Sequence, residues 1–245
     1  MEQKFTRMQA VGDIVAEFPK AAEIFKEHKI DFCCGGDKLL AVAVKELNLD
    51  EVTVLEKLNQ AYAALVKNKQ ESQDIDWRQQ SFSQLIDHIV STHHLYLQRE
   101  LPQISEFTNK ILRVHGAKHG ELAKVHKLFH MLKMELEQHL IKEEEILFPL
   151  IKEYEKNPSV QFLEKIKNVT NDTEAEHEQA GDIIKELRKI TNQFQYPADA
   201  CTSFKIAYQK LEEMESDLFQ HIHLENNILH PRLHAKALRP FRKGM

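Results

Sequence analysis

The chain has 245 residues, and 33 Lys and Arg against 38 Asp and Glu give it a net charge of −5 with neutral histidine. No apolar run approaches the ~18 residues that a membrane span requires, so we expect no membrane helix. The mildly acidic balance lacks any long run of Lys or Arg, and this argues against binding nucleic acid through its phosphates. Because the first residues do not resemble a secretory signal, we expect a cytoplasmic protein.

Glycine and proline are scarce, with 7 residues each. Together they reach about half of their usual share, which indicates few turns and long helices. We therefore predict an all-α fold. The spacing of turn residues and polar stretches divides the chain into a small helical domain over 1–68, a linker over 69–80, a larger helical domain over 81–236 and a tail over 237–245.

In the small domain, Asp31-Phe-Cys33-Cys34-Gly-Gly-Asp37 joins two predicted short helices. Thiols shortly before a helix N-terminus favour the thiolate, so we predict Cys33 and Cys34 to be the reactive residues of the protein. Adjacent cysteines close a strained ring if they pair with each other, and a metal, a mixed disulfide or a nitric oxide adduct is therefore favoured. The alternative is a tight Gly-Gly turn with two half-buried thiols. Cys201 carries no sequence signal.

The larger domain contains four long amphipathic segments, over 81–114, 120–156, 160–194 and 203–234. The breaks between them are short and hold glycine, proline and asparagine. Short connections make consecutive helices antiparallel, so the segments predict an up-down-up-down four-helix bundle.

Each segment has a histidine on its apolar stripe. The second, third and fourth segments give His139, His177 and His221. On the first segment, a stripe through Val90 reaches either His93 or His94, and periodicity does not choose between them. Counting residues from the predicted turns places one histidine of every helix at the same level of the bundle. His115 lies 21 residues beyond His94, roughly 30 Å along a continuous helix, and we leave it out of the site.

Two carboxylates join these histidines. Glu143 and Glu225 follow His139 and His221 by four residues, a spacing that puts both side chains on one helix face. The pattern His-x-x-x-Glu-x-x-Ile-Leu-x-Pro occurs at 139–149 and again at 221–231. The stripe of the second segment continues to Ile146, and of the run at 143–145 only Glu143 is expected to point inward.

Four imidazoles and two carboxylates in a core cost many kcal/mol unless they are compensated, and metal coordination is the usual compensation. Nitrogen and oxygen donors without thiolate suit iron, with manganese or zinc possible. We predict a dinuclear site in which the two Glu bridge the ions, with room for an oxo bridge and an exogenous ligand. The alternative is a set of hydrogen-bonded core histidines beside solvated carboxylates.

The combined motifs resemble the RIC family, the di-iron proteins that repair iron centres and carry a hemerythrin-like domain. The resemblance covers nearly the whole chain and lies in Phe32-Cys33-Cys34-Gly35-Gly36, in His93-His94, in the two repeated motifs and in Glu176-His177-Glu178. It implies two iron ions, a cytoplasmic homodimer, and restoration of iron–sulfur clusters damaged by nitric oxide or peroxide. Position by position it points to these ligands: His94, His139, Glu143, His177, His221 and Glu225.

Three functions remain open at this stage. The protein could supply iron to damaged iron–sulfur proteins, with the Cys33-Cys34 module as the docking element. It could be an enzyme that reduces nitric oxide to nitrous oxide at two ferrous ions. It could also be a reversible O2 or nitric oxide carrier, although a carrier does not need the thiol module. We favour repair, and leave enzymatic activity undecided.

Overall fold

The computed structural model describes residues 4–67 and 75–237. In these ranges the regular structure is helical, apart from one isolated antiparallel bridge between Ala10 and Leu39. The predicted all-α fold is therefore confirmed. None of the helices in the described ranges has the length and hydropathy needed to cross a membrane.

Residue contacts divide the chain into two compact units. One consists of residues 1–81 together with 222–245, and the other of residues 82–221. The last stretch of the fourth long helix thus belongs with the N-terminal helices, which the sequence did not suggest. The predicted linker lies partly, and the predicted tail almost wholly, outside the described residues.

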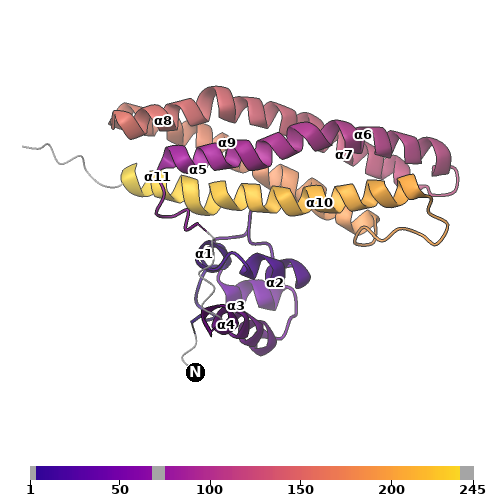
Figure 1. Ribbon diagram of the computed structural model, residues 1–245, viewed down its shortest axis with the longest axis horizontal. Helices are drawn as coiled ribbons and strands as arrows, with labels where there is room; N and C mark the ends of the chain where they lie inside the picture. Colours follow the sequence, from indigo (N-terminus) through magenta and orange to yellow (C-terminus); the bar gives the residue numbers. More distant parts are fainter. Residues whose placement is uncertain (1–3, 68–74, 238–245) are drawn as a thin grey trace, which may run out of the picture. The chain divides into compact units, whose positions relative to one another are not determined.

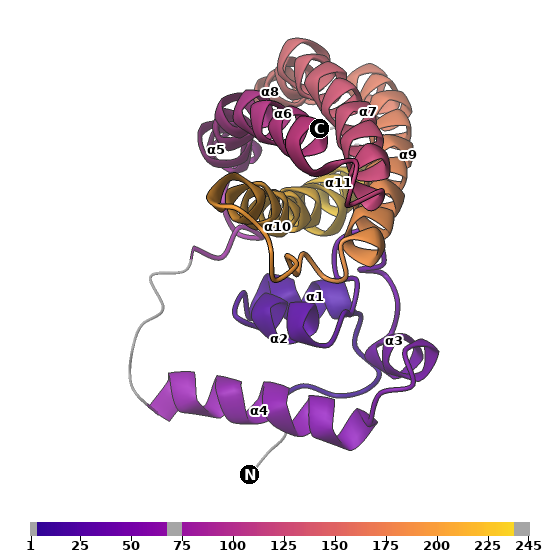
Figure 2. The ribbon, with the colours of Figure 1, turned by 90° about the vertical axis from the view of Figure 1, so that its right-hand side faces the viewer.

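The N-terminal residues form four short to medium helices (Figure 2). They are α1 (Val11–Glu17), α2 (Ala21–Glu27), α3 (Leu40–Glu46) and α4 (Glu51–Lys67). Aromatic side chains fill the space between them, because a helix of seven residues is stable only when its apolar face is packed. Phe5 stacks on Phe18 with ring centroids 5.9 Å apart, and Tyr62 of α4 meets both rings edge-on.

The larger helical region consists of four long rods, which Figure 1 shows running alongside one another. Three of the rods contain a short π-helical turn, labelled η. The first rod is α5 (Phe82–Ile89), η1 (Val90–His94) and α6 (Leu95–His115); the second is α7 (Glu121–Lys142), η2 (Glu143–Leu147) and α8 (Phe148–Lys156); the third is α9 (Val160–Ile190); the fourth is α10 (Thr202–Leu224), η3 (Glu225–Leu229) and α11 (His230–Ala237).

These rods match the four predicted segments, and their short connections make neighbours antiparallel. The third rod ends at Ile190, four residues before its predicted end. The cause is local: Asn192, Gln193 and Phe194 have φ angles of 49°, 63° and 56°, a left-handed conformation that a right-handed helix cannot include.

The π turns change the phase of the buried stripes. On the second rod, Leu132 and Leu136 are buried as expected, but after η2 it is Leu147 that is fully buried while Ile146 is 49% exposed. On the first rod, Ile89 is buried where Val90 was expected. A π turn holds one more residue than an α turn, so the apolar pattern shifts by one position. The predictions for Ile146 and Val90 are wrong for this reason.

Candidate metal centre

Each π turn carries one of the predicted ligands. His94 is the last residue of η1, while Glu143 and Glu225 are the first residues of η2 and η3. π turns are costly and occur most often at functional sites. α9 is α-helical from Val160 to Ile190, and His177 lies within this regular helix.

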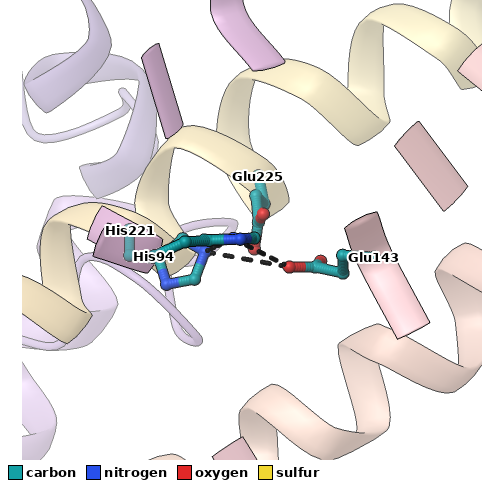
Figure 3. Close-up of side chains that lie close together, drawn as sticks. All are labelled: His94, Glu143, His221 and Glu225. Atoms are coloured by element: carbon teal, nitrogen blue, oxygen red, sulfur yellow. Dashed lines mark hydrogen bonds and ion pairs between the residues drawn. The ribbon is translucent and has the colours of Figure 1, made fainter. Parts of the chain in front are cut away.

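The structure brings together all six residues predicted as ligands. All of them are buried, with relative exposures between 0% and 4%. They form two groups whose ligand atoms lie within 4.8 Å of one another: His94, Glu143, His221 and Glu225 in the first, and His139, Glu143, His177 and Glu225 in the second. Figure 3 shows the side chains of the first group converging. Glu143 and Glu225 are common to both groups.

The distances between donor atoms fit metal coordination. The Nε2 atoms of His94 and His221 are 3.2 Å apart, and those of His139 and His177 are 3.1 Å apart. At a metal–nitrogen distance of 2.0–2.1 Å, neighbouring ligands of a four- to six-coordinate ion are separated by about 2.8–3.4 Å. Oε2 of Glu143 lies 3.3 Å from Nε2 of both His94 and His139, between the two groups. The residues present therefore fit two ions.

Two further carboxylates orient the imidazoles. Nδ1 of His94 lies 2.8 Å from Oε1 of Glu144, and Nδ1 of His139 lies 2.8 Å from Oε2 of Glu176. An Nδ1–H that donates to a carboxylate leaves the Nε2 lone pair facing the centre of the bundle, as in most histidine–metal sites. Hydrogen bonds from His139 and then Lys142 lower the pKa of Glu176 to about 2, so this carboxylate stays ionised.

Sequence reasoning missed Glu144, which it placed on a solvated face. The structure has it half-buried and bonded to His94. Two successive acidic residues at the start of a π turn are the pattern that indicates a half-buried second carboxylate, because the wider turn brings both side chains toward the core. Glu176 directly precedes His177 in the sequence, but its bond to His139 on another rod has no sequence signal.

The structure places His94, and not His93, in the first group of donors. Nδ1 of His93 lies 2.9 Å from Oδ1 of Asp217, a carboxylate oxygen that accepts a hydrogen bond. The His93 ring stacks on His221, with an interplanar angle of 2° and centroids 5.6 Å apart. Both histidines are buried because the last two residues of η1 face the neighbouring rod.

His115 lies outside both groups. Its Nε2 is 3.1 Å from Sγ of Cys201, an exposed residue directly before α10. The hydrogen bond from His115, followed by those from the backbone N–H groups of Phe204 and Ser203, lowers the pKa of the Cys201 thiol. Cys201 thus has a favourable environment for a thiolate that the sequence did not reveal.

The environment of Cys33 has the opposite effect on the pKa of its thiol. Its Sγ lies 3.7 Å from that of Cys34, and the residue is only 1% exposed. The hydrogen bond with Cys34, burial, and the nearby Asp31 carboxylate all raise the pKa of the Cys33 thiol. Burial and negative neighbours therefore disfavour the thiolate of Cys33, despite the start of α3 at Leu40, and the reactivity of Cys33 and Cys34 stays a prediction.

The fold and the buried donors together define a cation-binding four-helix protein of the hemerythrin type. The family model described as "Hemerythrin HHE cation binding domain" matches residues 85–233, and one described as "Domain of Unknown function (DUF542)" matches residues 7–62. The family model and the buried donor groups therefore indicate the same class of protein.

Curated relatives cover nearly the whole chain. A "Probable iron-sulfur cluster repair protein" of Haemophilus influenzae is 36% identical over 92% of this chain and 96% of its own length. The iron-sulfur cluster repair protein ScdA of Staphylococcus epidermidis is 33% identical over 91% and 97%, and YtfE of Escherichia coli O81 is 35% identical over 92% and 96%. The chain belongs to this family of iron–sulfur cluster repair proteins, as its motifs indicated.

Proposed function

We propose that the protein repairs iron–sulfur clusters by supplying iron from a site that holds two iron ions. The observation that carries the proposal is the pair of buried donor groups that share Glu143 and Glu225. Two imidazoles and two shared carboxylates for each ion match the preference of iron for mixed nitrogen and oxygen ligands. The names of the relatives support repair as the biological role.

The protein residues have separable roles in this proposal. His94 and His221 would hold one ion and His139 and His177 the other, and Glu143 and Glu225, which belong to both donor groups, would contribute to the binding of both. Bound iron would supply exchangeable ions and open coordination positions for nitric oxide, O2 or an oxo bridge. Glu144 and Glu176 keep the Nδ1 protons of their histidines in place, so that Nε2 always offers its lone pair.

Isotope transfer tests the supply of iron. The protein is loaded with 57Fe and mixed anaerobically with an iron–sulfur enzyme whose cluster has been damaged by nitric oxide. We expect the label to enter the rebuilt cluster, and enzyme activity to return, more completely than with the same amount of free iron. Glu143→Ala removes a donor from both groups and should abolish the transfer. Glu145→Ala, an exposed neighbour, is the matched control and should leave it unchanged.

Two results would contradict the proposal. Recovery of the enzyme without label in its cluster would mean that the protein acts in another way. Release of nitrous oxide over many turnovers, with the iron retained, would identify a nitric oxide reductase, and reversible gas binding alone would identify a carrier.

We further propose that the partners are damaged iron–sulfur proteins in the cytoplasm, and that the protein acts as a homodimer. The proposal of a dimer rests on the family resemblance. Sedimentation analysis at micromolar concentration tests it, and a mass of 28.6 kDa, that of one chain, would refute it.

A further inference from the structure

The loop between α2 and α3 is built around one carboxylate. Oδ1 of Asp31 accepts hydrogen bonds from the backbone N–H of Cys33, Cys34 and Gly35, at 3.2, 3.0 and 3.1 Å. The Sγ of Cys33 lies 3.3 Å from the same oxygen. Three backbone donors fix the position of this carboxylate, and the turn they enforce brings both thiols to it.

The spacing of the three side chains fits a single metal ion. The two Sγ atoms are 3.7 Å apart, and one ligand atom from each of Asp31, Cys33 and Cys34 lies within 4.8 Å of the others. A tetrahedral ion with metal–sulfur bonds of 2.3 Å separates two sulfurs by about 3.8 Å, and separates sulfur from a carboxylate oxygen by about 3.6 Å. A disulfide would require about 2.0 Å between the sulfurs.

Residues outside the loop hold it in this conformation. Nδ2 of Asn227, on η3 and in the same compact unit, donates to the carbonyl oxygens of Phe32 and Cys33 at 3.1 Å each. The absence of a side chain at Gly36 makes room for the amide, because a Cβ there would lie 2.7 Å from Cγ of Asn227. The ring of Phe32 also packs edge-on against His223, with centroids 5.8 Å apart. The donors are thus positioned before any ion binds.

The chemistry of the thiols is consistent with such a site. A thiol that coordinates a bound cation gives up its proton. The balanced step is M2+ + 2 Cys–SH → M(S–Cys)2 + 2 H+, in which no atom is oxidised or reduced.

We propose that Asp31, Cys33 and Cys34 form a second metal site, separate from the central six residues, that binds one divalent ion with affinity for thiolates. Three protein ligands leave a fourth position for a donor from another molecule, which is the property of a site that passes its ion on. That the ion is Fe2+ in transit to a damaged cluster rests on the proposed function; the existence of the site does not.

Cobalt titration of the full-length, iron-loaded protein tests the site. The protein is kept anaerobic with a phosphine reductant, and Co2+ is added while the near-ultraviolet band of cobalt–thiolate charge transfer and the release of protons are followed. The central ligands contain no sulfur, so only a thiolate site gives this band. We expect one equivalent of Co2+ to develop the band and to release about two protons.

Four variants make the assignment specific. Cys33→Ala and Cys34→Ser should each abolish the band, and Cys201→Ser should keep it. Asp31→Asn retains an oxygen that accepts the three N–H bonds but lowers the charge, so it should keep the fold and weaken Co2+ binding by about 10-fold or more. Circular dichroism of each variant confirms that it is folded.

The outcomes separate this proposal from the proposed function. No band in the folded wild-type protein, or a band that persists in Cys33→Ala, refutes the second site. A band in the wild type together with failure of 57Fe transfer leaves the site standing and refutes the supply of iron. Transfer at the wild-type rate by the double variant Cys33→Ala/Cys34→Ser refutes the role of the site as a station for iron.

Discussion

Replacement of Gly36 by alanine tests whether Asn227 holds the cysteine loop. No glycine in the described residues has a positive φ, so alanine can adopt the backbone conformation of Gly36 without strain. The obstacle is the side chain: the new Cβ would lie 2.7 Å from both Cγ and Nδ2 of Asn227. Asn227 must therefore move, and its two hydrogen bonds to Phe32 and Cys33 are lost.

The size of the effect follows from these contacts. Two hydrogen bonds contribute about 1 kcal/mol each, and the steric overlap adds about 1–2 kcal/mol. Gly36→Ala should therefore lower the free energy of unfolding by about 3–4 kcal/mol, and Asn227→Ala by about 2 kcal/mol. In the Asn227→Ala background the three atoms nearest to the new methyl group are gone, and Gly36→Ala should cost less than about 0.5 kcal/mol there.

Urea unfolding of the four proteins measures this cycle. The single tryptophan, Trp77, lies in the same compact unit, and its carbonyl accepts a hydrogen bond from Arg232, so its fluorescence reports on this unit. Gly120→Ala, which lies in the other compact unit and is followed by circular dichroism, is the control for the substitution itself, because a Cβ there meets nothing within 4 Å. It should be neutral or stabilising by up to about 1 kcal/mol. An equal cost of Gly36→Ala with and without Asn227 would refute the reasoning.

Three further predictions follow from the contacts described above. Glu144→Ala should weaken iron binding by about 10- to 100-fold while Glu145→Ala leaves it unchanged, measured by competition with a chelator. Because its pKa is lowered by His115, Cys201 should be alkylated by iodoacetamide at lower pH than an ordinary thiol; His115→Ala should move the rate–pH profile to higher pH, and an unmoved profile would exclude that bond as the cause. Arg188→Met removes the guanidinium that pairs with the buried carboxylate of Glu215 on α10, so it should lower the free energy of unfolding by about 3–5 kcal/mol. Thermal or urea unfolding measures the loss, and a value below about 1 kcal/mol would contradict this.

The architecture was accessible from the sequence because it depends on local signals. Scarce glycine and proline, long apolar stripes and short breaks define the rods, and the i, i+4 spacing puts Glu143 beside His139 and Glu225 beside His221 on one helix face. Antiparallel packing then places one histidine of each rod at the same level of the bundle. Composition, apolar periodicity and residue spacing were enough for these steps.

The π turns could not be predicted in the same way. They are defined by backbone hydrogen bonds, and the hydropathy pattern does not indicate to which carbonyl oxygen each N–H donates. The exchange of Ile146 for Leu147 in the core is the visible result. The contact of Asn227 with the cysteine loop was equally hidden, since it joins residues 194 positions apart in the chain.

The π turn at η2 separates the packing of the second rod from the arrangement of its ligands. A π turn of five residues rotates the chain by roughly as much as four α-helical residues do. Deleting one residue from η2 would therefore restore ordinary hydrogen bonding and keep Phe148, Ile151 and Tyr154 in the core, but Glu143 and Glu144 would no longer both turn toward the centre. Such a deletion would spare the packing of the rod and cost the protein its arrangement of ligands.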